Sequence, residues 1–348
     1  MMLEFFTYAA IFAVGFLVTS KMAPFFIKRM HARGFTGKDM NKFKKPDVAE
    51  FGGFLIFFGF VFSVVTAIFT STYLHLIEIN LTLLIAGMST IVVISFIGLI
   101  DDLIGWKKGI RQWQHALFPI FAALPLMAVK VNNPPIYMPL IGIVPSEYLL
   151  PFFGLVSFGT IYSLIIVPIG ITGASNATNM FAGLNGLEAG LGILIYLTML
   201  PLAFINGQIE AAIICVSMLA ALIAFIRFNW FPAKIFGGDG LTLTVGAGIA
   251  VVSILGNMEK IGVLLMALFF IELVLKAKSK FQAESFGKPT KSGLLQRPYK
   301  DIRSLTQWPM NGKLTEKQVV VRLLALQALV CIAVFLASYL AVFRFLAI

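Results

Sequence analysis

The chain has 348 residues, of which 59% are hydrophobic and 12% charged, and its mean hydropathy is +0.92. This composition excludes a soluble globular protein, because a soluble core of this size cannot enclose so much apolar surface. A net charge of +11 is compatible with nucleic acid as a partner. The basic residues, however, stand in loops beside apolar runs, where anionic lipid or a phosphorylated substrate fits better.

Ten apolar runs are long enough, or nearly so, to cross a bilayer. They cover residues 3–27, 52–74, 80–100, 114–129, 149–173, 187–205, 209–226, 241–258, 260–277 and 319–348. The fourth run is short and contains Pro119 and Pro125, so we expect it to be kinked or partly interfacial. The sequence therefore predicts an all-α integral membrane protein with about ten transmembrane helices, organised as one domain over residues 1–348.

The distribution of Lys and Arg predicts the orientation of these helices. All but four of the 27 basic residues fall in or directly beside five loops, at 28–51, 101–113, 174–186, 227–240 and 278–318. Because cytoplasmic loops carry the excess of positive charge, we expect these loops to be cytoplasmic and both termini to lie outside. Most carboxylates follow the same partition, so the active site is predicted on the cytoplasmic loops.

The first of these loops combines basic residues with an acid. Lys42 and Lys45 can form a basic lip that attracts phosphates, and Glu50 follows them just before the second apolar run. We predict that all three contact substrate. The alternative is a loop held by lipid headgroups.

Asp101 and Asp102 directly follow the third apolar run, at what the sequence predicts to be the end of a helix. Two adjacent carboxylates there repel each other and the helix dipole, so a solvated helix end explains them poorly. We predict a catalytic pair, in which one carboxylate faces a metal or diphosphate and the other takes a proton or meets a cation. Several basic side chains follow within reach: Lys107, Lys108, Arg111 and His115.

A polar, glycine-punctuated stretch interrupts the apolar sequence at residues 176–190. Asn176 and Asn179 are three residues apart, so they share a face if the helix continues. Amide oxygens can ligate a hard cation without adding charge that repels a diphosphate. We predict that Asn176, Asn179, Gly183 and Asn185 contact substrate. Helix capping is the alternative for any single Asn.

The segment 227–240 brings Asp239 to the start of the eighth predicted helix, where capping and catalysis are both reasonable roles for an Asp. Phe236 lies beside three glycines and can stack on a base. The last loop, 278–318, is the longest polar segment, and its Arg297 and Arg303 fit either a flap over the substrate or a basic surface on anionic lipid.

Taken together, these motifs resemble the polyprenyl-phosphate N-acetylhexosamine-1-phosphate transferase family, which is glycosyltransferase family 4. The resemblance covers nearly the whole chain, and the stretch Asn176–Gly190 and the run Gly37–Lys42 are similar to the eukaryotic and archaeal dolichyl-phosphate branch. The resemblance implies a Mg²⁺-dependent reaction, with Mn²⁺ as an alternative ion, in which a UDP-N-acetylhexosamine and a polyprenyl or dolichyl phosphate give a polyprenyl-diphospho-sugar and UMP.

By the same resemblance, Asn179 and Asp239 meet the metal and diphosphate. Asp101 and Asp102 orient or deprotonate the lipid phosphate, and Asn185 contacts the uracil. The chain departs from the family at two places. His115 stands where the dolichyl-phosphate branch has a lysine, which puts the identity of that cation in doubt. Residues 304–310 contain no histidine where bacterial members have several, so Arg297, Arg303 or Gln307 is left to replace them.

The sequence thus predicts an integral membrane transferase that moves a sugar 1-phosphate, with GlcNAc-1-phosphate as the first choice. Transfer of phospho-MurNAc-pentapeptide or another UDP-sugar is the alternative within this class, and a transporter or flippase is the alternative outside it. We expect a prokaryotic plasma membrane rather than endoplasmic reticulum, with membrane lipids as partners. A homodimer, the prenyl chain length, and a direct or covalent mechanism are left open.

Overall fold

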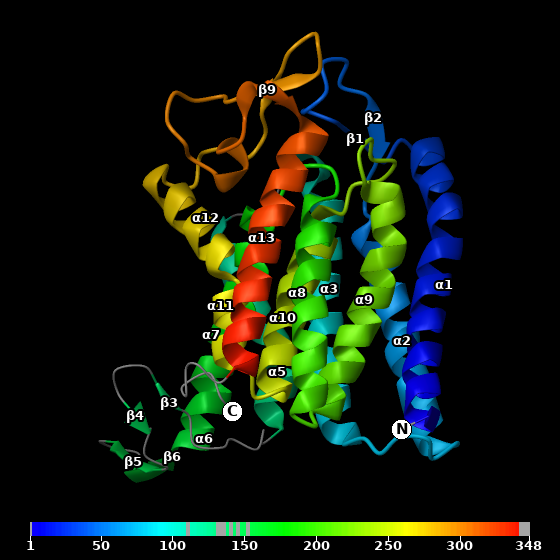
Figure 1. Cartoon of the computed structure of the whole chain (residues 1–348), viewed down its shortest axis with the longest axis vertical. Coiled ribbons are helices and arrows are strands. Elements are labelled where there is room, and N and C mark those ends of the chain that lie inside the picture. Colours follow the sequence, from blue (N-terminus) through cyan, green and yellow to red (C-terminus); the bar gives the residue numbers. More distant parts are fainter. Residues whose placement is uncertain are drawn as a thin grey trace.

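The computed structural model describes residues 2–108, 112–129, 137–138, 142–143, 147–150 and 154–340, and places side chains for residues 4–104, 117–129 and 158–340. The chain folds into an elongated bundle of helices (Figure 1). The long helices are α1 (Met2–Arg33), α2 (Gly53–Thr72), α3 (Leu81–Lys108), α7 (Val167–Met180), α8 (Leu187–Ile205), α9 (Ile209–Asn229), α10 (Gly238–Leu255) and α13 (Glu316–Tyr339).

Within the described part of the chain, eight helices are long and apolar enough to cross a membrane. They are the eight above, with α7 extended at its start by α6 (Phe158–Ile161) and a π-helical turn (Tyr162–Ile166) into one segment, Phe158–Met180. The predicted class, an all-α integral membrane protein, is confirmed. The four loops that connect α1 to α2, α7 to α8, α9 to α10 and α12 to α13 gather at one end of the bundle, which we call the loop end (Figure 1).

The other two predicted spans are each broken into shorter helices. The run at 114–129 forms α4 (Gln112–Ala122) and α5 (Leu124–Ala128), as expected from its two prolines. The run at 260–277 forms α11 (Glu259–Leu265) and α12 (Ala267–Lys278), which meet at Met266. None of these four helices is long enough to span a bilayer alone.

Two boundaries differ from the sequence prediction in a way that matters for the site. The third helix continues through Asp101 and Asp102 to Lys108, so the acidic pair lies inside a helix and not at its end. The helix predicted to end at residue 173 continues to Met180, so Asn176 and Asn179 do share one helix. Polar residues were read as loop in both places because hydropathy falls there, although the backbone stays helical.

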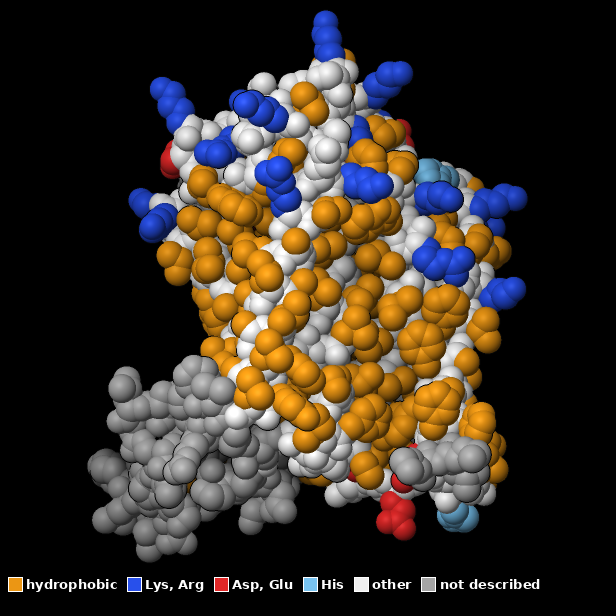
Figure 2. All heavy atoms as spheres, viewed as in Figure 1, with side chains coloured by type: hydrophobic (Ala, Val, Ile, Leu, Met, Phe, Trp, Pro, Cys, Tyr) orange, Lys and Arg blue, Asp and Glu red, His pale blue; other side chains and the backbone are white. Residues whose placement is uncertain are grey.

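Surface chemistry divides the bundle into two zones (Figure 2). Lys and Arg side chains gather at the loop end, and a broad belt of hydrophobic side chains covers the helices on the visible face. On α13 this belt includes Leu329, Ile332 and Leu336, all more than 45% exposed. Helix α1 begins, and α13 runs, toward the end of the bundle opposite the loop end.

Helix α10 forms the centre of the bundle, with 89% of its spanning residues buried. It packs closely on α3, since a Cβ at Gly98 of α3 would lie 2.6 Å from the carbonyl oxygen of Asp239. Small residues of this kind let helices approach in a membrane, where packing drives association. The start of α10 is thereby fixed at the loop end, directly against α3.

Short strands complete the two ends. At the loop end, β1 (Thr36–Lys38) pairs antiparallel with β2 (Asp47–Ala49), and a second sheet orders β7 (Lys288–Pro289), β8 (Leu294–Gln296) and β9 (Asn311–Thr315). Four more strands precede α6, namely β3 (Tyr137–Met138), β4 (Gly142–Ile143), β5 (Glu147–Leu150) and β6 (Gly154–Ser157). The hairpin β1–β2 is tied to the start of α10, because Ile235 bridges Ala49 and the Phe236 amide donates to the Ala49 carbonyl.

Candidate functional site

A polar cavity of about 330 Å³ opens at the loop end, between the first loop, the end of α7 and the start of α10. It collects residues that are far apart in sequence. The predicted site residues that line it are Glu50, Asn179, Gly183, Asn185, Phe236 and Asp239. Its other polar lining residues include Lys38, Asp39, Asn41, Glu188, Asn229 and Thr242.

The start of α10 is held by a carboxylate from another helix. Asp102 of α3 accepts hydrogen bonds from the backbone N–H of Asp239 at 2.7 Å and of Gly240 at 3.0 Å. These N–H groups belong to the first turn of α10, where helices lack internal acceptors and favour negative charge. At these two N–H groups, the capping role considered for Asp239 is filled by Asp102.

Glycine is required at this junction. Gly238 has φ +69°, and a Cβ there would lie 2.4 Å from a carboxylate oxygen of Asp102. The carboxylate of Asp102 therefore lies behind the cavity wall that carries Asp239. Asp101, its neighbour, is only 4% exposed and is not among the residues that line the cavity. The structure brings Asp102 next to Asp239 and directs its carboxylate at the start of α10, and neither Asp101 nor Asp102 lines the cavity.

Asn179 and Asp239 meet in the cavity through Thr242. The Thr242 hydroxyl lies 3.1 Å from Oδ1 of Asn179, to which it donates, and 3.3 Å from the carbonyl oxygen of Asp239. Helix α7 supplies the amide and the first turns of α10 supply the other two residues. Asn179 and Asp239 thus line the same cavity, and their predicted contact with a metal and diphosphate stays a prediction.

A buried charged cluster forms the opposite side of the cavity, and we call it the Asp39 cluster. Asp39 accepts from the amide nitrogen of Asn185 at 3.0 Å and pairs with Lys42 at 2.9 Å. Lys42 also pairs with Glu316, the first residue of α13, and Glu316 accepts from the backbone N–H of Asn185 at 2.9 Å. The cluster joins the first loop, the turn after α7 and the start of α13.

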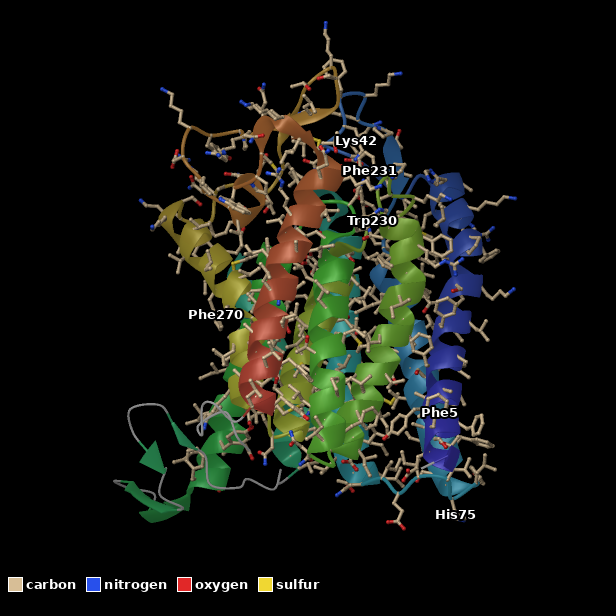
Figure 3. The ribbon with its side chains drawn as sticks, viewed as in Figure 1. Phe5, Lys42, His75, Trp230, Phe231 and Phe270 are labelled. Atoms are coloured by element: carbon tan, nitrogen blue, oxygen red, sulfur yellow. The ribbon has the colours of Figure 1, made fainter. Side chains whose placement is uncertain are left out.

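The Lys42 ammonium is therefore already engaged by protein groups. It lies 4.3 Å from the ring centre of Phe231, and Figure 3 labels both side chains at the loop end. Its side chain is 19% exposed. The sequence predicts that Lys42 contacts substrate. In the structure Lys42 pairs with Asp39 and Glu316, the two acids that accept hydrogen bonds from Asn185.

The turn at Gly183 is fixed by its own hydrogen bonds. The Gly183 N–H donates to Glu188 at 2.6 Å, and its carbonyl accepts from the amide of Asn41 at 2.8 Å. Asn41 in turn accepts from the N–H of Gly287, in the last loop, at 3.0 Å. Gly183 has φ +108°, which side chains rarely tolerate, so this turn requires glycine.

The three other predicted cations whose side chains the structure describes do not line the cavity. Lys45 is exposed, Arg297 donates to the Trp308 carbonyl at 3.5 Å, and Arg303 pairs with Asp301 at 3.0 Å. The Arg303 guanidinium also lowers the pKa of Asp301. The side chains of Lys107, Lys108, Arg111 and His115 lie outside the described residues, so their predicted roles stay predictions.

The segment at 304–310, which lacks the histidines of bacterial members, serves as internal structure. Ser304, Thr306 and Gln307 are fully buried. Ser304 and the Leu305 N–H both donate to Glu272 of α12, at 2.8 and 2.5 Å. Gln307 donates to the carbonyl of Glu284, which keeps its side chain within the last loop.

Four residues that shape the cavity were not among the predicted site residues: Asp39, Asn41, Asn229 and Glu316. The first two belong to the run Gly37–Lys42, whose similarity to the dolichyl-phosphate branch was the available signal. Glu316 follows Thr315 in a Thr315–Gln318 capping box, which predicts where α13 begins but not what its first residue contacts. Asn229, which accepts from the Gly186 N–H at 3.1 Å, belongs to the segment 227–240, in which only Asp239 and Phe236 were predicted as site residues.

A second and larger cavity, of about 960 Å³, lies along α7 beside the polar one. We call it the apolar groove, since most of its lining comes from aliphatic and aromatic residues of α7, α10, α11 and α12. Asn179 lines both cavities, and the adjacent residues Ser285 and Phe286 line the groove and the polar cavity respectively. Asn176 faces the groove, one turn of α7 away from Asn179.

Comparison with known proteins finds two kinds of similarity. Residues 84–257 match the family model described as glycosyl transferase family 4. Two archaeal proteins, from Sulfolobus acidocaldarius and Saccharolobus solfataricus, are 35% and 33% identical over 92% and 91% of this chain and 92% of their own lengths. Both are provisionally named UDP-N-acetylglucosamine–dolichyl-phosphate N-acetylglucosaminephosphotransferase. A phospho-N-acetylmuramoyl-pentapeptide-transferase of Limosilactobacillus reuteri is 32% identical over 70% of this chain and 73% of its own.

Proposed function

The chain belongs to glycosyl transferase family 4, and on this premise we propose that it transfers N-acetylglucosamine 1-phosphate from UDP-N-acetylglucosamine to a polyprenyl or dolichyl phosphate. The products are a polyprenyl-diphospho-sugar and UMP. Membership in the family confirms the resemblance predicted from the motifs. The choice of sugar and lipid follows the names of the two archaeal relatives, which are similar over most of the chain.

One observation carries the proposal beyond family membership. The reaction joins a water-soluble nucleotide sugar to a lipid, so it needs a polar site and an apolar site that meet at the reacting atoms. The polar cavity and the apolar groove have this relation, because Asn179 lines both. We assign the nucleotide sugar to the polar cavity and the prenyl chain to the groove, whose volume of about 960 Å³ suits a long hydrocarbon.

The transfer itself is proposed as a direct in-line displacement. An oxygen of the lipid phosphate attacks the β-phosphorus of the UDP-sugar, the bond from that phosphorus to the oxygen of UMP breaks, and UMP leaves. Phosphoryl transfer of this kind depends mainly on positioning and on neutralising charge. Asn179 lies where the two substrates meet, Asp239 lies beside it, and Asn185 presents its amide to the nucleotide from the Asp39 cluster.

Asp102 has a different role in this scheme. Its carboxylate holds the first turn of α10 and so fixes Asp239, while Asp101 lies buried next to it. A covalent intermediate on an aspartate is the alternative route. Asp239 is the acid that faces the cavity in the right place for it, so the two routes differ in whether Asp239 binds or attacks.

Mg²⁺ is proposed as the cofactor, with Mn²⁺ as an alternative, held by Asn179 and Asp239. Within the described part of the chain, no group of three or more His, Cys, Asp or Glu residues forms a metal site by itself. A hard cation with one carboxylate and one amide completes its shell with substrate phosphates and water, as Mg²⁺ commonly does. When bound, the ion neutralises the charge that develops on the phosphates.

The loop end is proposed to face the cytoplasm of a prokaryotic plasma membrane. Lys and Arg gather there, and cytoplasmic segments carry the excess of positive charge (Figure 2). UDP-sugars are soluble phosphates, so a basic surface beside the cavity attracts them. The chain's similarity to a phospho-N-acetylmuramoyl-pentapeptide-transferase makes UDP-MurNAc-pentapeptide a second candidate substrate.

The test is a transfer assay with purified enzyme, Mg²⁺, dolichyl phosphate and radiolabelled UDP-GlcNAc. We expect label to move into a chloroform-soluble product with release of UMP, and EDTA to stop the transfer until Mg²⁺ is added back. UDP-GalNAc and UDP-MurNAc-pentapeptide in competing reactions decide the sugar. Preferred use of either one over UDP-GlcNAc would overturn the proposed specificity, and absence of any lipid-linked product would overturn the proposed activity.

A further inference from the structure

The apolar groove contains one feature that the proposed reaction has not used, a lysine in its wall. Lys276, near the end of α12, is the one basic residue among the described residues that line the groove. Its side chain is only 8% exposed. A buried ammonium is costly beside hydrocarbon unless anions or dipoles compensate it, so its position at an otherwise apolar surface calls for an explanation.

The local contacts satisfy only part of this ammonium. Nζ of Lys276 donates to the carbonyl of Ala283 at 2.5 Å and to the hydroxyl of Ser285 at 2.9 Å. An ammonium has three N–H donors, so these two bonds leave one for a ligand. Glu272 lies 3.8 Å away, beyond hydrogen-bond distance, and does not line the groove.

The oxygens of Glu272 are directed elsewhere. One accepts from Ser304 and the other from the Leu305 N–H. Glu272 is fully buried behind Lys276, so it holds the last loop while the lysine faces the groove. Lys276 forms an ion pair with Glu272 at 3.8 Å and is the basic group of the groove, which it lines together with the amide groups of Asn176 and Asn179 and the hydroxyl of Ser285.

This arrangement matches an amphiphile with an anionic head and one long apolar chain. We propose that Lys276 binds the phosphate of the acceptor lipid at the loop end of the groove, with the chain extending along α7 and α11. The inference rests on the proposed function and deepens it by assigning the cation that receives the acceptor. Lys276 thereby holds the attacking phosphate close to Asn179, where the groove meets the polar cavity.

The test compares Lys276→Gln with Lys278→Gln, a neutralisation of an exposed lysine two residues further along the same helix. Michaelis constants are measured for dolichyl phosphate and for UDP-GlcNAc, and binding of dolichyl phosphate and uncharged dolichol is measured by native mass spectrometry. Hydrogen bonds to charged groups predict that K276Q raises KM for the lipid phosphate by about tenfold or more. We expect KM for UDP-GlcNAc and binding of dolichol to stay within about twofold, and K278Q to resemble the wild type.

Equal losses for both substrates, or for dolichol and its phosphate, would show that Lys276 only supports the last loop. An unchanged KM for the lipid phosphate would also overturn the inference, while a wild-type enzyme that makes no lipid product overturns the proposed function instead. Excess phosphatidylglycerol in the assay separates the sources of phosphate: the inference predicts no competition, and a phospholipid site predicts displacement of dolichyl phosphate.

A second variant keeps the inference testable if K276Q does not fold. Glu272→Gln removes the negative charge behind Lys276 while keeping an oxygen that accepts hydrogen bonds. The positive field at the groove then increases, so KM for dolichyl phosphate is expected to fall by about threefold. A raised or unchanged KM for the lipid phosphate in E272Q would contradict the inference.

Discussion

The two sides of the polar cavity are built in different ways. The helical side consists of the start of α10 against α3, where one carboxylate, Asp102, accepts from two backbone N–H groups. The loop side is the Asp39 cluster, in which charged side chains from three segments satisfy one another. The first depends on backbone geometry and close packing, and the second on ion pairs and hydrogen bonds between loop segments.

The two sides of the cavity also carry residues with different proposed roles, in catalysis on the helical side and in nucleotide binding on the loop side. The helical side carries Asp239, which is proposed to bind the metal and diphosphate, and its position is set by packing that tolerates little change. The loop side carries Asn185, which is proposed to contact the nucleotide, and its position is set by charges that substitution can weaken in steps. We therefore expect the helical side to control kcat and the loop side to control KM for the UDP-sugar.

The largest effect is expected from Asp239→Ala. Loss of this carboxylate removes one of the two proposed metal ligands, so kcat should fall by about 10³-fold or more. Thermal stability should change less than in variants of Asp102, because the carboxylate that holds the first turn of α10 belongs to Asp102. The measurement is product formation at saturating substrates. If D239A keeps more than a tenth of the wild-type kcat, Asp239 is not at the reacting centre. The helical side of the cavity then does not control kcat as expected.

Asp102 is expected to show the next largest effect, and two substitutions reveal what it does. Asp102→Ala removes both acceptors from the start of α10, so we expect a loss of about 10²-fold in kcat through misplacement of Asp239 and a loss of about 1–2 kcal/mol in stability. Asp102→Asn keeps one acceptor oxygen and should retain clearly more activity.

The order of these two variants separates positioning from proton transfer. A general base loses its function equally in both variants, because neither Ala nor Asn accepts a proton. Turnover and detergent-solubilised melting temperatures of D102A and D102N decide between the two. Equal activities would support the predicted deprotonation of the lipid phosphate by Asp102. They would contradict a role for Asp102 in positioning the start of α10.

The sequence predicted the helical side well in content and less well in geometry. Hydropathy located eight of the spans, and the motif residues Asn179, Asn185 and Asp239 do line one cavity. Hydropathy could not show that α3 continues past Asp102 or that α7 continues to Met180, because helix continuation at a polar interface depends on packing and not on apolar character. The capping of α10 by another helix was invisible for the same reason.

The loop side was harder to predict. Ion pairs such as Lys42 with Glu316 join residues from opposite ends of the chain, and a single sequence gives no measure of which loops meet. Lys42 and Asp39 were visible as a basic and acidic run, but a basic loop beside a membrane predicts lipid contact as readily as a buried pair. Lys276 stands near the end of the apolar run 260–277, directly beside the last loop. Nothing in its neighbours in the sequence indicates that it faces a groove.

Lys42→Met tests the loop side and should give an intermediate effect. It leaves Asp39 and Glu316 without their cation in a buried cluster, which is expected to cost about 3 kcal/mol in stability. Asn185 then loses its fixed position, so we expect KM for UDP-GlcNAc to rise by about tenfold with little change in kcat. The double variant Lys42→Met with Glu316→Gln removes one of the two uncompensated charges and should recover part of the stability. A fall in kcat with unchanged KM would move Lys42 to the reacting centre.

The smallest effect is expected from Arg303→Ala, which tests whether the last loop also forms part of the nucleotide site. Arg303 is exposed and pairs with Asp301 in the last loop, away from the residues that line the polar cavity. Exposed pairs contribute little and are screened by salt, so kcat and both Michaelis constants should change by less than about threefold. Asp301→Asn is the matched control, since it breaks the same pair but keeps the arginine. If R303A raises KM for UDP-GlcNAc much more than D301N does, the last loop closes over the bound nucleotide, and the predicted substrate contact of Arg303 is formed only in that closed state.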